Sequence, residues 1–451
     1  MSLMFDYITM LEKIFHLSVN KTDLKNEFIG GSTTFMTMAY IIFVQPVVLS
    51  AAGMDFGAVI TATCISSALA IFLMGLYANY PVALAPGMGQ NFFFAYTVVL
   101  TMGVSWQVAL GMVFVAGVLF VLLTVVGLRS KMIDAIPESL KHAIAVGIGL
   151  MITLIGLEWG GLVVDHPSLL VTLGDFGNPA TQVTLLGLLI TSILLIRNVP
   201  GAMLIGILVT TVIGWALDLI PYYGVFSAPP SIRPTLFQLD ILGTFKPELV
   251  MVVFTFLILA MFDTIGTLVG VTNEAGFLVN GKLPRAEKAL FADATGTIIG
   301  ALGGTSTITA YIESAAGVAS GARTGLANMF TGLFFILALF FYPLIQMIAG
   351  GVKTGTGPIL YPSIAPVLIL VGIYMMKSIR HIPWEDFSES IPAFLTFVFI
   401  PFSFRITEGI AIGFISYVIL KVVKGEVKKI PLLMWLFASI FLLRYIFFGL
   451  D

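Results

Sequence analysis

The feature that most constrains this chain is a succession of apolar stretches, many of them about as long as a bilayer is thick, with short connections between them. A helix needs roughly 20 mostly apolar residues to cross the hydrocarbon core of a membrane. We therefore predict an all-α polytopic membrane protein with fourteen transmembrane segments. These segments lie at about 30–52, 57–79, 82–103, 106–127, 137–157, 182–197, 200–220, 247–271, 288–302, 305–321, 325–349, 358–379, 390–404 and 406–423.

Composition excludes a separate soluble domain. Only 10% of the residues are charged, whereas soluble domains contain about 25%, so residues 1–451 are predicted to form a single membrane unit. The one cysteine, Cys64, excludes a disulfide framework, and no metal or cofactor is expected. The N-terminal residues lack the pattern of a signal peptide. The expected partner is the lipid bilayer, and no nucleic acid is expected.

The distribution of Lys and Arg predicts the topology, because cytoplasmic loops carry an excess of these residues. With a cytoplasmic N-terminus and fourteen crossings, seventeen of the 22 fall inside and four outside. One miscounted crossing would exchange the sides of all later loops and remove this bias. We therefore predict a multi-pass protein of the plasma membrane with its N-terminus in the cytoplasm. The inner residues are Lys13, Lys21, Lys25, Arg129, Lys131, Lys141, Arg197, Lys282, Arg285, Lys288, Arg323, Lys377, Arg380, Lys421, Lys424, Lys428 and Lys429, and the outer ones are Arg233, Lys246, Lys353 and Arg405.

A fifteenth apolar stretch, 431–449, follows the last basic run and contains Arg444, which the count leaves over. Two arrangements remain open for this extra C-terminal hydrophobic helix. It either spans the membrane or lies along the inner leaflet, with the basic run on anionic headgroups.

The two halves of the chain resemble each other weakly but in the same order. Residues 33–46 align with 255–267, 142–151 with 366–376, and 201–209 with 408–416, each pair seven segments apart. A repeated unit of seven crossings enters the membrane from the opposite side the second time. The sequence therefore predicts two inverted repeats of seven segments, as in many secondary transporters.

The third and tenth segments contain residues that disfavour a continuous helix. The third, YPVALAPGMGQNFFFAYTVV, is rich in Pro and Gly, and the tenth begins with Gly303 and Gly304 before a run of small polar and β-branched residues. Non-helical backbone at membrane depth is tolerated only where it is buried in protein or lines a cavity. These segments occupy corresponding positions in the two halves, which is typical of a transporter's substrate site. Kinked packing helices are the alternative.

Two carboxylates lie deep in the apolar segments. Asp263 follows a long apolar run in the eighth segment, and Glu313 lies in the middle of the tenth. Such residues usually face a cavity and have a function, although a protonated or paired structural carboxylate is the alternative. Asp293 and Glu408 are weaker candidates, which we expect to be ordinary acids at helix starts.

Four blocks carry a family resemblance. NEFIGGSTTFMTMAYIIFVQP, YANYPVALAPGMGQNFFFAY, MFDTIGTLVG and TSTITAYIESAAGVASGARTGL closely resemble the AzgA-like purine permeases, a branch of the nucleobase:cation symporters related to the nucleobase–ascorbate transporters. The resemblance extends over about 26–423. It implies a core domain (30–127 and 247–349) and a gate domain (137–220 and 358–423), with short strands in segments 3 and 10. Substrate would bind between core and gate, and an elevator-like sliding of the core would give alternating access.

The resemblance also implies site residues. Asp263 matches the family's eighth-segment carboxylate, Glu313 its tenth-segment carboxylate and Asn91 its third-segment amide, while Arg323 and Thr324 fall on the inner end of the tenth-segment signature. The family implies uptake of purine nucleobases (adenine, guanine or hypoxanthine) by proton symport. The preferred purine, sodium in place of the proton, and a homodimer remain open.

Three positions depart from the family pattern. Gln45 replaces the usual Asn, Phe92 a small Ala, and Arg405 a small or polar residue. Because Phe92 adjoins Asn91, it bears on which purine is preferred.

Chemistry suggests a role for each candidate. Glu313 is expected to accept N–H groups from the edge of the base, since charge-assisted hydrogen bonds are strong, and Asn91 supplies a donor and an acceptor. Asp263 is the preferred proton carrier, because burial favours the neutral form of a carboxylate, and Glu313 is the second residue expected to take part in proton coupling. Phe92 either stacks on the base or forms a steric wall.

Two other classes of function are the alternatives. An anion transporter of the same fold, of the sulfate or bicarbonate type, would hold its ligand at the start of the tenth-segment helix, but Glu313 would repel an anion there. A channel or a receptor is the other class, and the ring of pore-lining polar residues expected of a channel is not evident.

Overall fold

The computed structural model of the chain describes residues 10–127, 136–277, 283–353 and 357–447. Most of these residues are helical, and eight helical stretches are long and apolar enough to cross a bilayer. The protein is therefore a multi-pass membrane protein, as expected, while the count of fourteen crossings stays a prediction. Arg129, Lys131 and Lys282, which contribute to the predicted topology, lie outside the described residues.

The helices follow the predicted apolar segments closely. In the first half they are α2 (Leu24–Met38), α3 (Ile41–Ala51), α4 (Phe56–Leu73), η1 (Met74–Ala78), α5 (Met88–Phe92), η2 (Phe93–Thr101), α6 (Trp106–Val125), α8 (Glu138–Trp159), α9 (Pro179–Ile196) and α10 (Ala202–Ala216). In the second half they are η3 (Leu242–Thr244), η4 (Pro247–Leu249), α11 (Val250–Glu274), α12 (Ala286–Gly303), α13 (Ser314–Ala319), α14 (Gly325–Ala338), η5 (Leu339–Phe341), α15 (Tyr342–Ala349), α16 (Ala365–Met376), η6 (Lys377–His381), α17 (Phe387–Ser403), α18 (Ile406–Val423), η7 (Val427–Lys429) and α19 (Leu432–Phe447).

Polar residues in the short connections start several of these helices. Asp23 accepts a hydrogen bond from the backbone N–H of Asn26 before α2, and Asp55 accepts one from Ala58 before α4. Such N-caps satisfy backbone donors that the first helical turn leaves unpaired. The boundaries between apolar segments are therefore encoded locally.

The third and tenth segments contain strands, which confirms the non-helical backbone predicted there. Strand β1 (Leu84–Pro86) pairs antiparallel with β4 (Ile308–Ala310), and Ala85 lies opposite Thr309. The pair satisfies backbone groups that would otherwise be unpaired inside the protein. Two further antiparallel pairs lie in connections between helices: β2 (Val163–Asp165) with β3 (Val171–Leu173), and β5 (Val352–Lys353) with β6 (Ile359–Leu360).

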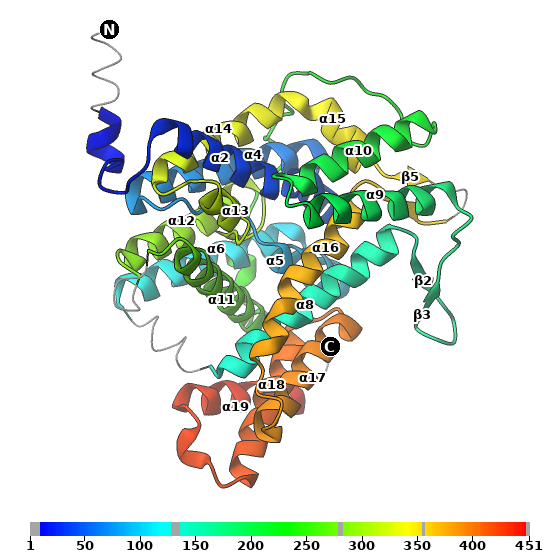
Figure 1. The fold of residues 1–451 in the computed structure, drawn as a ribbon. Coiled ribbons are helices and arrows are strands. Elements are labelled where there is room, and N and C mark those ends of the chain that lie inside the picture. Colours follow the sequence, from blue (N-terminus) through cyan, green and yellow to red (C-terminus); the bar gives the residue numbers. More distant parts are fainter. Residues whose placement is uncertain (1–9, 128–135, 278–282, 354–356, 448–451) are drawn as a thin grey trace.

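Helices from the two halves interleave (Figure 1). Helix α8 packs against α16 and α17, whereas α6 and α4 pack against α12, and α2 packs against α13 and α14. Each of these contacts joins one half of the chain to the other. The elements that flank the β1–β4 pair therefore come from segments more than 200 residues apart in the sequence.

The C-terminal helix α19 packs along α18 (Figure 1). Phe437 of α19 lies 4.6 Å from Phe254 of α11 and 6.1 Å from Phe414 of α18, measured between ring centroids. Near the end of α19, the hydroxyl of Tyr445 donates to Oε2 of Glu408, in the first turn of α18, at 2.5 Å. The two helices thus run antiparallel, while α19 is not among the eight stretches long enough to cross a bilayer. Both arrangements of the C-terminal helix therefore stay predictions.

Candidate functional site

The candidate site surrounds the β1–β4 pair, from which two short helices start. Helix α5 begins two residues after β1, and α13 begins four residues after β4. The amide of Asn328, in α14, fixes the backbone that precedes β1, because its Nδ2 donates to the carbonyl oxygens of Val82 (2.8 Å) and Tyr80 (3.1 Å). The segment from Tyr80 to the start of α5 is therefore fixed by side chains as well as by strand pairing.

Glu313 lies between β4 and α13, and it accepts hydrogen bonds from residues at and just before the break between α2 and α3. Tyr40 stands at this break, is 2% exposed, and donates its hydroxyl hydrogen to Oε1 of Glu313 at 2.6 Å. Thr37 donates to the backbone oxygen of Glu313 at 3.3 Å. Tyr40 was not predicted as a site residue, because in the sequence it is one more residue of an apolar run.

Small residues let α2 and α13 approach closely enough for this contact. A Cβ atom on Gly317 would lie 1.9 Å from Oγ1 of Thr34, and one on Gly30 would lie 2.5 Å from Cβ of Ala322. Neither position has room for a larger side chain. The register between α2 and the tenth segment is therefore set by backbone contact at two points.

Glu27 stabilises the contact between α2 and the tenth segment at the end that leads into α14. Its buried carboxylate accepts hydrogen bonds from the backbone N–H groups of Arg323 (2.9 Å), Thr324 (3.1 Å) and Ala327 (3.0 Å). It thereby caps α14, whose first N–H groups have no partner within the helix. The guanidinium of Arg323 donates to the carbonyl oxygens of Val318 and Ala322, both at 2.7 Å. The signature residues Arg323 and Thr324 thus take part in the turn between α13 and α14.

Asp263 lies in α11 and receives a hydrogen bond from Gln90 of α5. The distance from Nε2 of Gln90 to Oδ2 of Asp263 is 3.3 Å. Gln90 is 2% exposed. Gln90, unlike the neighbouring Asn91, was not predicted as a site residue, although an amide in a broken membrane segment was a usable signal.

Asn91 joins the two broken segments to each other. It accepts a hydrogen bond from the hydroxyl of Ser306, and its Nδ2 donates to the carbonyl oxygen of Pro86 at 3.4 Å. The side chain is fully buried. Gln45 supports the same region, because its Nε2 donates to Oγ1 of Thr305 at 2.9 Å. Direct contact of Asn91 with substrate stays a prediction.

Phe92 points toward the neighbouring helix α8. It is 1% exposed, and its ring centroid lies 5.8 Å from that of Tyr96 and 6.3 Å from that of Trp159, the last residue of α8. Trp159 in turn lies 4.8 Å from Tyr361. Phe93 packs instead on Phe256 of α11, at 4.8 Å. Consecutive phenylalanines thus face different helices, and Phe92 is the one that contacts the predicted gate domain.

Asp293 is not an acid at a helix start, contrary to the expectation from sequence. Helix α12 begins at Ala286, so Asp293 lies beyond its first turn, where it is fully buried. Its Oδ2 accepts from Thr264, the residue after Asp263, at 2.6 Å, and Thr264 also lies 3.1 Å from Thr309 of β4. Asp293 therefore belongs to the polar shell behind the strand pair. Glu408, in the first turn of α18, is placed as expected.

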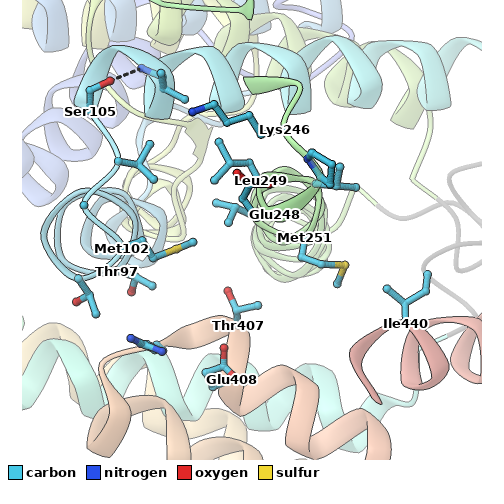
Figure 2. Close-up of a pocket in the computed structure, with 18 of the residues that line it drawn as sticks. Thr97, Met102, Ser105, Lys246, Glu248, Leu249, Met251, Thr407, Glu408 and Ile440 are labelled. Carbon is cyan, nitrogen blue, oxygen red and sulfur yellow. Dashed lines mark hydrogen bonds between the residues drawn. The ribbon is translucent and has the colours of Figure 1, made fainter. Parts of the chain in front are cut away.

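A cavity of about 930 Å³ lies between η2, the start of α11, the start of α18 and α19 (Figure 2). Its polar lining includes Lys246, Glu248, Arg405 and Glu408. Thr97, at one side of it, donates to the carbonyl oxygen of Phe404 at 2.6 Å and so links η2 to the turn before α18. Arg405, which departs from the family pattern, is therefore a cavity residue.

Comparison with known proteins identifies relatives along almost the whole chain. Residues 25–412 match the family model Xan_ur_permease, described as Permease family. The chain is 43% identical to adenine permease AdeP of Escherichia coli over 439 residues, 97% of this chain and 96% of that protein. It is also 43% identical to guanine/hypoxanthine permease PbuG of Bacillus subtilis over 438 residues, 94% of this chain and 97% of that protein.

Among solved structures, the fold is similar to that of the transmembrane domain of the cyanobacterial bicarbonate transporter BicA. The TM-score is 0.63 at 13% sequence identity, over 85% of this chain and 97% of that domain. At this identity the likeness concerns the fold.

Proposed function

Since this chain belongs to the Permease family and, within it, to the AzgA-like purine permeases, we propose that it carries purine nucleobases across the plasma membrane. It is a transporter and not an enzyme. The names of its relatives include both adenine and guanine/hypoxanthine permeases, which supports the class of adenine, guanine and hypoxanthine as substrates. The structural observation that carries the proposal is the β1–β4 pair, around which Glu313, Asp263 and two amides are gathered.

Glu313 binds the hydrogen-bonding edge of the base. Tyr40 donates to Oε1, and Oε2 is the second oxygen of the carboxylate. An N–H group of a purine donates to this second oxygen, in a charge-assisted bond of the stronger kind. Asn91, in the third segment, contributes the donor and acceptor of its amide if the site opens around it.

Asp263 carries the coupling ion. A carboxylate inside the membrane protein takes up a proton when the site faces the side of higher proton activity, and releases it on the other side. Proton symport then links uptake of base to the proton gradient. A sodium ion at the same carboxylate is the alternative coupling ion. Measuring whether a proton gradient or a sodium gradient drives uptake distinguishes the two ions.

Transport proceeds by alternating access between a core domain (30–127 and 247–349) and a gate domain (137–220 and 358–423). Side-chain contacts that join the two predicted domains mark the interface at which they would move. Phe92 meets Trp159, and Thr97 of η2 bonds to Phe404 at the turn between α17 and α18. In an elevator-like movement, these contacts break while the packing inside each domain persists.

Uptake into liposomes tests the proposal. Purified protein is reconstituted, a proton gradient is imposed, and entry of labelled hypoxanthine is measured with adenine, guanine, inosine or sulfate as competitors. Free bases are expected to compete strongly, and inosine and sulfate are not. Accumulation driven by a sodium gradient alone would show that sodium, and not the proton, is the coupling ion. Competition by sulfate without competition by bases would instead support the alternative of an anion transporter with the fold of BicA.

A further inference from the structure

Only the nitrogen of the Gln90 side-chain amide has a hydrogen-bond partner among the described residues. Its Nε2 donates to Oδ2 of Asp263 at 3.3 Å. Its Oε1 is buried and has no hydrogen-bond partner among the residues that the structure describes. Buried polar atoms in proteins are nearly always paired, so an unpaired acceptor needs an explanation.

The orientation of this amide is fixed by its surroundings. A carboxylate accepts hydrogen bonds, so Asp263 selects the NH₂ end of the amide and turns the oxygen away from itself. The oxygen then lies over Gly87, where a Cβ atom would come within 1.9 Å of it. The glycine at the start of α5 therefore leaves the space that Oε1 occupies, beside the β1–β4 pair.

From this geometry, and resting on the proposed function, we propose that Gln90 binds substrate and contributes to its selection. Its Oε1 accepts a hydrogen bond from an N–H group of the purine, while Asp263 holds the amide in the accepting orientation. The ligand is thus a heterocycle that presents an N–H donor beside Asp263. Gln90 thereby connects the bound base to the carboxylate that carries the coupling ion.

This role differs from that of Gln45, another buried amide near the strands. Gln45 also has an unpaired buried oxygen, but its Nε2 is bound to Thr305 and Ser306, without contact to a carboxylate. Gln45 therefore provides a matched control. Methionine at either position keeps the length of the side chain and removes the amide.

The test is a thermodynamic cycle between side chain and ligand. Binding of hypoxanthine and of its 1-, 7- and 9-methyl derivatives is measured on wild type, Gln90→Met and Gln45→Met. The 1-methyl derivative lacks the N–H of the six-membered ring, and the 7- and 9-methyl derivatives both lack the single imidazole N–H. The affinity of Gln90→Met for hypoxanthine is expected to fall about tenfold, the scale of one buried hydrogen bond. For the derivative or derivatives that lack the paired N–H, wild type and Gln90→Met should differ by less than about twofold, because the interaction is already missing. Gln45→Met should keep the wild-type pattern of discrimination.

An equal loss for all four ligands in Gln90→Met, or none, would overturn the proposal. If that variant does not fold, Gln90→Asn replaces it, because its shortened amide cannot reach Asp263 and the base together and should give the same loss of discrimination. Purine binding by wild type distinguishes a failure of the proposed function from a failure of the role proposed for Gln90. Absence of any binding rejects the proposed function, whereas binding with unchanged discrimination in the Gln90 variants rejects only the role of Gln90.

Discussion

The hydroxyl of Tyr40 lies 2.6 Å from Oε1 of Glu313, in a part of the protein where Tyr40 is only 2% exposed. Hydrogen bonds to charged groups contribute about 1.5–3 kcal/mol. Tyr40→Phe is therefore expected to weaken binding of labelled hypoxanthine by about 10- to 100-fold. Tyr311→Phe, which loses a bond to the carbonyl oxygen of Pro86, should have a smaller effect. Equal binding by wild type and Tyr40→Phe would show that Glu313 does not depend on this contact.

The two carboxylates are expected to differ in function. Asp263→Asn should retain exchange of labelled base across the membrane of preloaded liposomes but lose accumulation driven by the proton gradient. Glu313→Gln should weaken binding of base by about 1.5–3 kcal/mol, the scale of a hydrogen bond to a charged group. If both variants lose the same function to the same extent, the carboxylates act as one coupled pair that shares a proton.

Phe92 is expected to act as a steric wall, because its ring is already packed on Tyr96 and Trp159. Phe92→Ala should admit purine analogues with bulky substituents, while uptake of the natural base changes little. Competition of hypoxanthine uptake by such analogues measures this. A fall in affinity of about 1–3 kcal/mol for every purine would instead identify a stacking partner. Unchanged transport of natural and bulky bases alike would place Phe92 outside the site.

Glu27 is expected to contribute to stability and not to selection of the base. Glu27→Gln replaces one acceptor oxygen with a donor opposite the N–H groups of Arg323, Thr324 and Ala327. An unpaired buried donor costs about 1–3 kcal/mol, so the unfolding temperature in detergent should fall. The relative affinities for different purines should remain those of wild type, and a change in their order would contradict this assignment.

A pH effect is expected just beyond the C-terminal end of α18, outside the apolar segments. The hydrogen bond from Lys429, followed by that from Lys421, lowers the pKa of Glu426 from its usual value near 4.5 to about 2. A lowered pKa in the folded state stabilises the protein above about pH 4.5, and this stabilisation disappears as the pH falls toward 2. Glu426→Gln should therefore lower the unfolding temperature at pH 7 and have progressively less effect below pH 4.5. A constant difference at all pH values would exclude this ion pairing.

The architecture was largely predictable because membrane segments are encoded by local composition. Apolar runs, capping residues such as Asp55 and the Pro and Gly of the broken segments all lie in the sequence next to the structure that they determine. The position of α19 was not predictable in this way. Its packing on α18 depends on Phe437 and on the bond from Tyr445 to Glu408, which are contacts between segments.

The site was predictable only in part, for a similar reason. Asp263 and Glu313 are conspicuous because charge is rare in apolar segments. Tyr40 and Gln90 carry no charge, and their importance comes from bonds to residues more than 170 positions away in the sequence. Asp293 was misjudged because distance to a segment end does not indicate which face of a helix is buried.

The pairing of β1 with β4 also has a consequence for synthesis on the ribosome. Leu84 is translated well over 200 residues before its partner, Ala310. Backbone groups that enter lipid without a partner carry a cost of several kcal/mol each, so the third segment cannot reach its final conformation while the second half is still unmade. During this interval the nascent third segment must either form a provisional helix or wait in the protein-lined channel of the insertion machinery. The strand pair at the predicted site therefore forms only after the tenth segment has been made, and a chain truncated before residue 308 lacks one of its two strands.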